Sequence, residues 1–429
     1  MQDEAVSVSN DAVWQGLEGA RILYLTYDGL TDPLGRSQIL PYLTALANLG
    51  YRFVVISCEK PDRLESGGGL VEKICAESGI AWYPLRYHKY PPVLSSIWDM
   101  AVTIRLAEKL QRNAPFDLIH CRSYMPAIAG QRMKRKFGTK FLFDMRAFWA
   151  DERVDGGQWR LDRFTDRAVY KYFKRKESAF FREADHVVSL TEAGRQVMLE
   201  RPEFEAGGPP ISIIPCCVDF EHFAPSSPAG KARARVELGI GEEERVGVFL
   251  GSMGSLSMLA EMLDFFQVYK TREPNAHFLL ITPDRPKPII EAARERGLDP
   301  SSLTVRSASR EEVPFLSAAA DYGLFFVRPV PSKRGGSPTK MGELLALGLP
   351  IVTNSDVGDV EPLLVELEAG AIVKAFNKEA YREAIDRLAA MPPDRDGIRR
   401  RARTRLDLAA AVARYDTIYR EMLGLAVAR

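Results

Sequence analysis

Short apolar runs alternate with longer amphipathic stretches in the first half of the chain, and this rhythm constrains the fold more than any other feature. The amphipathic stretches have helical spacing, and the clearest of them cover residues 37–49, 95–111 and 125–137. The apolar runs cover residues 21–27, 53–57, 117–121, 141–145, 186–190 and 211–215. Such an alternation is typical of a parallel sheet covered by helices on both faces. We therefore predict an α/β domain of the doubly wound type.

The rhythm breaks once and then restarts. Residues 219–231 hold a cluster of Pro, Ser and Gly that is typical of a linker. Further apolar runs follow at 246–250, 277–281, 303–305, 322–327 and 351–353. A chain of 429 residues is also too long for one ordinary hydrophobic core. We predict a second doubly wound domain, so that ligands bind in a cleft at the carboxyl ends of the two parallel sheets.

The predicted boundaries follow from these patterns. We expect a disordered tail over 1–20, a first domain over 21–215, a hinge near 215–230 and a second domain over 216–409. The stretch from residue 398 onward is rich in Arg, Ala and Leu at helical spacing. We expect its end, about 410–429, to be a helix that packs back on the first domain.

Composition narrows the classes of function. The 58 basic and 57 acidic residues nearly balance, so nothing predicts a nucleic-acid partner. The five cysteines show no paired spacing, which fits a reducing cytosol better than a disulfide framework. No apolar run approaches the roughly 20 residues that span a bilayer, and the first 20 residues lack a signal-peptide core. We predict a cytoplasmic protein that meets a membrane, if at all, from its inner surface.

The segment 328–354 carries the strongest functional signal. Gly335 and Gly336 allow close backbone approach to a ligand, Ser337 is a good helix N-cap, and Pro338 suits the first helical position. We expect a helix from Thr339 to about Leu347 that ends at Gly348. A glycine-rich loop that opens a helix binds anions through free N–H groups and the helix dipole. The alternative is a capped surface helix in which Lys340 and Glu343 form an ion pair.

The sequence SPTKMGELLALGLPIVTN resembles the nucleotide-binding segment of the retaining family-4 glycosyltransferases, which carries E-x7-E before G-x-P. Glu343 matches the second glutamate, which holds the ribose, whereas Gly335 stands where the first would be. The segments DLIHCRSYMPAIAG, ISIIPCCVDFEHF and FLGSMGSLSMLAEMLDFF also resemble the family. The resemblance implies the GT-B fold, in which two Rossmann-like domains face each other across a cleft. The N-terminal domain then binds the acceptor and the C-terminal domain binds the nucleotide-sugar.

The resemblance also implies a reaction. A hexosyltransferase of this type moves a sugar, with retention, from a nucleotide-diphosphate sugar to a saccharide, lipid-linked or small-molecule acceptor in glycan or glycolipid biosynthesis. No metal or other cofactor is expected, because the family does without the Asp-x-Asp metal motif. The family's basic pair is missing from the turn at 251–255, so other groups must stabilise the leaving diphosphate. The donor-binding candidates are Gly35, Gly251, Ser252, Lys333, Arg334, Gly336, Ser337, Pro338, Thr339, Lys340 and Glu343.

Catalytic candidates follow two apolar runs of the first domain. Arg122 stands where related enzymes often carry histidine, and it can clamp a phosphate or a carboxylate but cannot act as a base. The stretch FDMRAFWADER supplies Asp144 and Arg146 to orient substrate and Glu152 to activate an acceptor hydroxyl. The alternatives are a structural Asp–Arg pair and, for the nearby His120, a satisfied core histidine.

Residues 160–185 form a basic amphipathic pattern, and 131–140 add charge in the same domain. Such a face can rest on anionic lipid, or its aromatics can pack on the sheet while its charges are solvated. Two other functions also remain open. A sugar-nucleotide epimerase can share this architecture, and the missing first glutamate and basic pair suit a non-catalytic nucleotide-sugar-binding or scaffold subunit.

Overall fold

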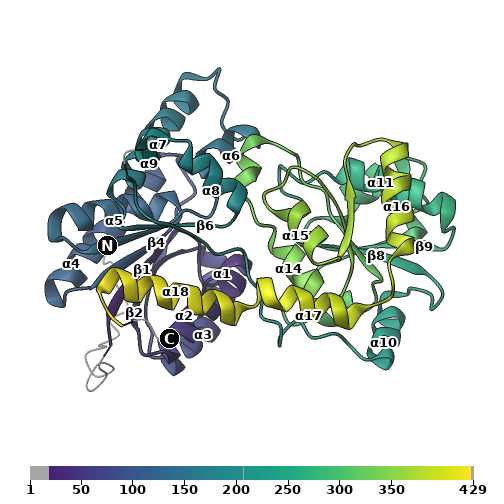
Figure 1. The fold of residues 1–429 in the computed structure, drawn as a ribbon, viewed down its shortest axis with the longest axis horizontal. Coiled ribbons are helices and arrows are strands. Elements are labelled where there is room, and N and C mark those ends of the chain that lie inside the picture. The colour runs from purple at the N-terminus through teal and green to yellow at the C-terminus, as the bar shows by residue number, and fades with distance from the viewer. Residues whose placement is uncertain (1–18, 206, 427–429) are drawn as a thin grey trace.

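The computed structural model describes residues 19–205 and 207–426, and it contains two parallel β-sheets side by side, each covered by helices (Figure 1). Both sheets are parallel throughout. The predicted fold class, an α/β chain with two Rossmann-like domains, is confirmed. Most of the predicted tail, residues 1–18, lies outside the described residues.

The N-terminal sheet has seven strands in the order β3-β2-β1-β4-β5-β6-β7. Its strands are β1 (Arg21–Thr26), β2 (Arg52–Glu59), β3 (Ala81–Arg86), β4 (Leu118–Arg122), β5 (Lys140–Asp144), β6 (His186–Ser189) and β7 (Ile211–Ile213). Its helices are α1 (Pro33–Gln38), α2 (Leu40–Asn48), α3 (Pro61–Glu77), α4 (Leu94–Asn113), α5 (Tyr124–Phe137), α6 (Trp149–Asp155), α7 (Phe164–Glu183), α8 (Glu192–Leu199) and α9 (Pro202–Glu205). The central strands are buried on both faces, as their continuous apolar runs require.

The C-terminal sheet has six strands in the order β10-β9-β8-β11-β12-β13. Its strands are β8 (Arg245–Leu250), β9 (Ala276–Ile281), β10 (Leu303–Arg306), β11 (Tyr322–Leu324), β12 (Ile351–Asn354) and β13 (Gly370–Val373). The helical elements of this half are α10 (Pro228–Leu238), α11 (Leu259–Arg272), α12 (Pro286–Glu295), η2 (Pro300–Ser302), α13 (Val313–Ser317), η3 (Pro331–Gly335), α14 (Thr339–Ala346), α15 (Val360–Glu366), α16 (Lys378–Ala390) and α17 (Arg395–Leu406). One continuous apolar core fills this half.

Proline residues explain two local differences from the predicted elements. The single helix expected over 37–49 is two helices, α1 and α2, because Pro41 lies in the first turn of α2 and cannot extend α1. Part of the supposed linker at 219–231 is helical: the Ser227 side chain accepts a hydrogen bond from the N–H of Gly230 and caps α10, which begins at Pro228. The edge strands β3 and β13 were not predicted, since β3 contains Pro84 and β13 begins with Gly370, which leaves it a run of only three apolar residues.

The C-terminal stretch is also divided. It forms α17 and α18 (Leu408–Leu423), which are separated by the extended residue Asp407. Helix α17 packs on α14 of the second half, whereas α18 packs on α2 of the first half (Figure 1). At the crossing, Val218 donates a hydrogen bond to the carbonyl of Leu406 and accepts one from the N–H of Leu408. The two chain connections between the halves therefore lie side by side and are bonded to each other.

Candidate active site

A pocket of about 400 Å³ lies between the two halves and collects six of the donor-binding candidates from the second half and one catalytic candidate, Glu152, from the first. From the second half it is lined by Ser252, Lys333, Gly336, Ser337, Pro338 and Lys340. From the first half it is lined by Trp149, Glu152, Arg153 and Gln158 of α6 and the loop that follows it. Loops at the carboxyl ends of β5, β8 and β11 thus supply this wall of the interdomain space, where parallel sheets bind ligands.

The glycine-rich loop is built differently from the prediction. Helix α14 begins at Thr339 with Pro338 as its N-cap, and the Ser337 hydroxyl instead accepts a hydrogen bond from the backbone N–H of Cys216. Ser337 therefore bonds the connection between the two halves rather than capping the helix, which leaves the first N–H groups of α14 without a side-chain cap. At its other end the helix stops one residue earlier than predicted, and Gly348 follows with a positive φ of 71°.

The two glycines of the loop have different surroundings. A Cβ on Gly335 would lie 2.9 Å from the Phe148 ring of the first half, whereas a Cβ on Gly336 would first meet atoms of Lys333, at 3.3 Å. Both glycines are buried. The absence of a side chain at Gly335 lets η3 pack against the first half, and Gly336 lines the pocket, where close backbone approach to a ligand stays a prediction.

Lys340 lies in the first turn of α14 with its Nζ 3.8 Å from the centre of the Phe249 ring. A Cβ on Gly251 would be 3.9 Å from this Nζ, so the turn after β8 passes directly beside the amine. The carboxylate of Asp284 fixes that turn by accepting a hydrogen bond of 2.6 Å from the N–H of Met253. Burial lowers the pKa of Lys340 to about 7, against the opposing charges of Glu343 and Asp284. The amine is poised to gain a proton when an anion arrives.

Glu343 lies one turn further along α14. Burial raises the pKa of its carboxyl, while the positive charges of Arg310 and Lys340 oppose that rise. Arg310 follows β10 at the carboxyl edge of the same sheet. Burial lowers the pKa of its guanidinium, and the negative charge of Glu343 is the strongest of the opposing effects. The sequence alone identified neither Arg310 nor Asp284, because each lies on a different loop from the α14 segment and only the fold brings them together.

Lys333 and Glu152 form an ion pair of 2.6 Å across the gap between the halves. The backbone of the same loop is fixed by the first half as well: Ser332 donates its N–H to Asp155, and the Thr191 hydroxyl donates to the carbonyl of Arg334. The Arg334 side chain is exposed and does not line the pocket. In this conformation Lys333 is engaged by a carboxylate, and it must exchange that partner before it can bind a donor phosphate.

Gly35 lies in the first turn of α1, directly after the loop that follows β1, and does not line the pocket. It is buried against that loop, where a Cβ would come within 2.0 Å of the Gly29 carbonyl oxygen. The buried Glu59 carboxylate anchors this loop by accepting hydrogen bonds from the N–H groups of Leu30, at 2.7 Å, and Thr31, at 3.2 Å. The glycine is thus required by the close packing of α1 on this loop, and a direct contact with the donor is not needed to explain it.

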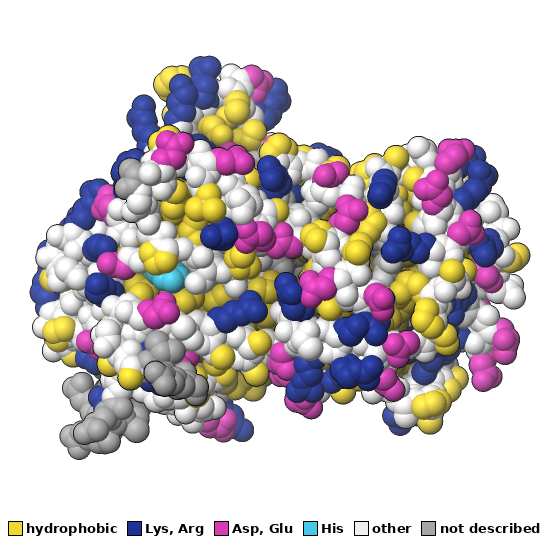
Figure 2. All heavy atoms as spheres, in the orientation of Figure 1, with side chains coloured by type: hydrophobic (Ala, Val, Ile, Leu, Met, Phe, Trp, Pro, Cys, Tyr) yellow, Lys and Arg dark blue, Asp and Glu magenta, His cyan; other side chains and the backbone are white. Residues whose placement is uncertain are grey.

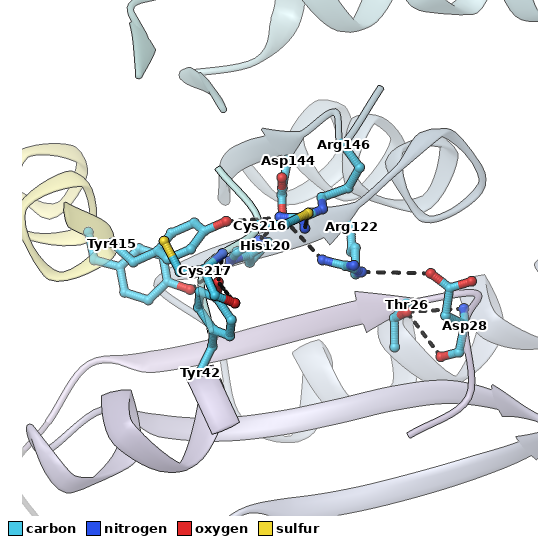
Figure 3. Close-up of polar contacts among 11 residues, drawn as sticks. Thr26, Asp28, Tyr42, His120, Arg122, Asp144, Arg146, Cys216, Cys217 and Tyr415 are labelled. Carbon is cyan, nitrogen blue, oxygen red and sulfur yellow. Dashed lines mark hydrogen bonds and ion pairs between the residues drawn. The ribbon is translucent and has the colours of Figure 1, made fainter. Parts of the chain in front are cut away.

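Arg122, Asp144 and Arg146 meet in a buried cluster (Figure 3). One carboxylate oxygen of Asp144 lies 3.9 Å from an Arg122 nitrogen and 3.7 Å from an Arg146 nitrogen, and it accepts a hydrogen bond of 3.2 Å from the hydroxyl of Tyr415 on α18. Burial alone raises the pKa of Asp144, but Arg146, His120 and Arg122 together outweigh it and lower that pKa to about 2.

This cluster supports the structural alternative for Asp144. Its side chain is 1% exposed, and the cluster surrounds a very small cavity closed by α18 rather than the interdomain pocket. His120 is likewise buried and bonds Asp144 and Tyr419, as a satisfied core histidine does. Arg122 alone points outward from the cluster, with its Nε 3.7 Å from a carboxylate oxygen of the half-exposed Asp28 (Figure 3).

No group of three or more His, Cys, Asp and Glu side chains in the described part of the chain is arranged to hold a metal ion. Independence from metal stays a prediction. Within the same residues, no helix is long and apolar enough to cross a membrane.

Solved structures with the same architecture cover nearly the whole chain. Sucrose-phosphate synthase from Thermosynechococcus elongatus is 16% identical with a TM-score of 0.72, covering 94% of this chain and 99% of its own. HepE from Anabaena, in complex with UDP-glucose, is 15% identical with a TM-score of 0.68, covering 94% and 99%. WaaG, a glycosyltransferase involved in lipopolysaccharide biosynthesis, is 16% identical with a TM-score of 0.65, covering 92% and 99%. At sequence identities this low, the structural similarity establishes the fold alone.

Matches to family models identify the class of enzyme. No curated protein sequence matches the chain. Residues 40–222 match the model described as Glycosyltransferase Family 4, and residues 230–405 match the model described as Glycosyl transferases group 1. The two matches fall on the two halves in order and together cover most of the chain. The chain is therefore a GT-B glycosyltransferase that is similar to family 4.

Proposed function

We propose that this protein is a retaining hexosyltransferase that takes a nucleoside-diphosphate sugar into the interdomain pocket and passes the sugar to a saccharide, lipid-linked or small-molecule acceptor. The single observation that carries the proposal is the position of Lys340. Its amine lies at the uncapped start of α14, beside the turn at Gly251, on the wall of a pocket that both halves share. A diphosphate there meets free N–H groups, the positive end of a helix dipole and a cation.

The roles of the residues follow from charge. Cleavage of the anomeric C–O bond leaves negative charge on the diphosphate, and Lys340 with the α14 amides would stabilise that charge. Glu343, deeper along the helix, would accept hydrogen bonds from the ribose hydroxyls. Lys333 would join the phosphate contacts once Glu152 releases it. Ser252 and Gly251, in the turn after β8, would approach the diphosphate through their backbone.

The carboxylates near the pocket bear on the stereochemistry. Among the described residues that line it, Glu152 is the only carboxylate, and it is occupied by Lys333. This arrangement offers no free nucleophile on the protein. It favours a front-face path, in which an oxygen of the leaving phosphate takes the proton of the acceptor hydroxyl and the anomeric configuration is retained. Analysis of the product's anomeric configuration by NMR tests this directly, and inversion would refute it.

The donor site is tested by calorimetric titration of UDP, GDP, ADP and TDP. UDP is the first choice because the HepE structures contain UDP and UDP-glucose. We expect one nucleotide to bind selectively, and Glu343→Ala to weaken it by about 1–3 kcal/mol through loss of a charged hydrogen-bonding group. Glu383→Ala, on the exposed face of α16, is the matched control and should bind as the wild type does. Failure of all four nucleotides to bind would overturn the site.

The acceptor is proposed on chemical grounds. An enzyme of glycan or glycolipid biosynthesis that uses a cytoplasmic nucleotide-sugar would work in the cytoplasm, with peripheral contact at the inner membrane face where the acceptor is lipid-linked. A nucleotide-sugar epimerase and a non-catalytic binding subunit are excluded by one result. Release of nucleotide that requires an acceptor identifies a transferase. An epimerase would interconvert the sugar without an acceptor, and a binding subunit would leave the nucleotide-sugar unchanged with or without an acceptor.

A further inference from the structure

The helices α4, α5 and α7 pack side by side on one face of the N-terminal sheet and enclose a basic groove on their outer surface. The groove is lined by Arg132, Arg135 and Lys136 of α5 and by Lys176 of α7, with Ile104 of α4 at its edge. It plays no part in the donor pocket, which lies at the other end of these helices.

Positive charge exceeds negative charge around this groove. The single carboxylate of Glu108 is shared by Arg112, Arg132 and Lys136, so two of these three positive charges are left over. Glu183 pairs with Arg135. The hydrogen bond of Lys176 goes to the neutral Gln131 side chain, at 2.9 Å.

The solvent face of α7 continues the positive charge. Arg167, Lys171 and Arg175 are exposed, and within 19–205 and 207–426 none of them forms an ion pair. Figure 2 shows the Lys and Arg side chains gathered on the projection that the start of α7 makes from the body of the molecule, next to apolar side chains. A broad, nearly flat anionic surface would contact these basic side chains together.

Large apolar side chains lie exposed on the same helices. Phe164 at the start of α7 is 76% exposed, and Tyr172 is 45% exposed. Tyr172 lies one helical turn before Lys176, whose Nζ is 5.9 Å from the centre of the Tyr172 ring, so this aromatic side chain borders the groove. On α4, Leu94, Ile97 and Trp98 are each more than half exposed. A helical face that mixes exposed aromatics with cations is suited to the interfacial region of a bilayer.

The apolar end of this face adjoins the mouth of the donor pocket. Gln158, which lines the pocket, is followed by Trp159, whose ring stacks on Phe173 of α7 at 5.9 Å between centres. At the other side, the Tyr27 hydroxyl donates a hydrogen bond to Asp99, which ties the start of α4 to the loop at the carboxyl end of β1. A surface that rests on the apolar end would therefore bring the pocket mouth close to it.

We infer that the outer face of α4, α5 and α7 docks on an anionic lipid bilayer and that the acceptor is a lipid-linked saccharide presented at that bilayer. The acceptor half of this inference rests on the proposed glycosyl transfer. A bilayer accounts for both features of the face, since its phosphate headgroups match the surplus cations and its acyl boundary accepts Phe164 and Trp98. A soluble polyanion accounts for the cations alone.

The test is cosedimentation of the purified full chain with vesicles of phosphatidylcholine alone and of phosphatidylcholine with 30% phosphatidylglycerol. We expect binding to the anionic vesicles only. The triple variant Arg167→Glu, Lys171→Glu, Arg175→Glu should lower the partition coefficient at least about tenfold, since each cation near such a surface contributes severalfold. Phe164→Ser with Trp98→Ser should also weaken binding. The matched control is Lys287→Glu, Arg294→Glu, Arg382→Glu, three exposed cations on α12 and α16 that should leave binding unchanged.

Each outcome of the vesicle experiment either supports or overturns the inference. Equal sedimentation of the wild type with neutral and anionic vesicles, or full binding by the α7 triple variant, would overturn the inference. Loss on charge reversal with no effect of the aromatic pair, together with tight binding to poly-glutamate, would assign the face to an acidic protein instead. Unchanged calorimetric nucleotide binding by each variant shows that it is folded. Nucleotide binding without vesicle binding would overturn the docking alone, and vesicle binding without nucleotide binding would overturn the proposed function alone.

Discussion

Protonation of Lys340 should make donor binding depend steeply on pH. The pKa of the amine is about 7 in the free protein, because burial disfavours its charged form. A bound diphosphate supplies the missing counter-charge and should return the pKa toward the ordinary lysine value near 10.5. The amine is then protonated in the complex but largely neutral in the free protein above pH 7. Binding must take up a proton, and affinity must fall as pH rises through the pKa of the free protein.

The magnitude follows from these two pKa values. With the free amine at about 7 and the bound amine near 10.5, the Kd of an intact nucleotide-sugar should rise about thirtyfold between pH 6 and pH 8.5. At pH 7.5 the complex should take up about 0.8 proton per donor. An intact nucleotide-sugar is the right ligand, because its diphosphate has no ionisation in this range whereas a free nucleoside diphosphate does.

Isothermal titration calorimetry measures both quantities. Titrations of UDP-glucose in phosphate and in Tris at one pH give the proton uptake from the difference in heat, and a pH series gives the Kd. Lys340→Met should bind weakly with a nearly flat pH profile, and Lys340→Arg should also be flat because a guanidinium stays charged. A wild-type Kd that changes less than about threefold between pH 6 and 8.5, or the same slope in Lys340→Met, would refute the reasoning.

Three further perturbations test other parts of the structure. Glu152→Gln should tighten nucleotide-sugar binding about two- to fivefold, because it releases Lys333 from its ion pair. Adding Lys333→Ala to this variant should remove the gain. If calorimetry shows no tightening in Glu152→Gln, Lys333 does not reach the phosphates. Asp144→Ala should lower the free energy of unfolding by about 3–5 kcal/mol, because it leaves the buried Arg146 without its counter-charge, and a denaturant midpoint unchanged from wild type would contradict this. Lys340→Met should raise the Tm of the free protein by a few degrees at pH 7, since a desolvated amine is removed, and a lower Tm in calorimetric scanning would count against that burial.

Periodicity was enough to predict the fold class, and it missed two edge strands, β3 and β13, although it found the short edge strands β7 and β10. The strand pattern of 21–27 is long and fully apolar, and it is β1 with a buried run. By contrast, β13 has four residues beginning with Gly370, so its pattern carries too little contrast to stand out. The break in the C-terminal helical pattern at Asp407 was missed for a related reason: a single extended residue does not interrupt the apolar period on either side of it.

The site was predictable where one segment contained it. Lys340 and Glu343 share one helix turn, and both lie where the loop-and-helix pattern indicates. Arg310 and Asp284 come from other loops, and their approach to α14 depends on sheet order, which the spacing of motifs does not encode. Asp144 was ambiguous because a carboxylate at the end of a strand has the same sequence signature whether it faces a cleft or is covered by a later helix. Here the helix that covers it comes from the end of the chain.

The return of α18 to the first half has a consequence for how the protein is made. Ala411, Tyr415 and Tyr419 are buried in the same core as β1 and α2, so the core of the first half is completed by residues that are synthesised after the whole second half. A nascent chain therefore emerges with an apolar face on its N-terminal half and must carry it uncovered through the synthesis of the whole second half. Such an exposed intermediate is prone to aggregation. Its lifetime is set by the speed of translation rather than by the folding rate of either half, so folding yield in the cell should be sensitive to the loss of even a few C-terminal residues of α18.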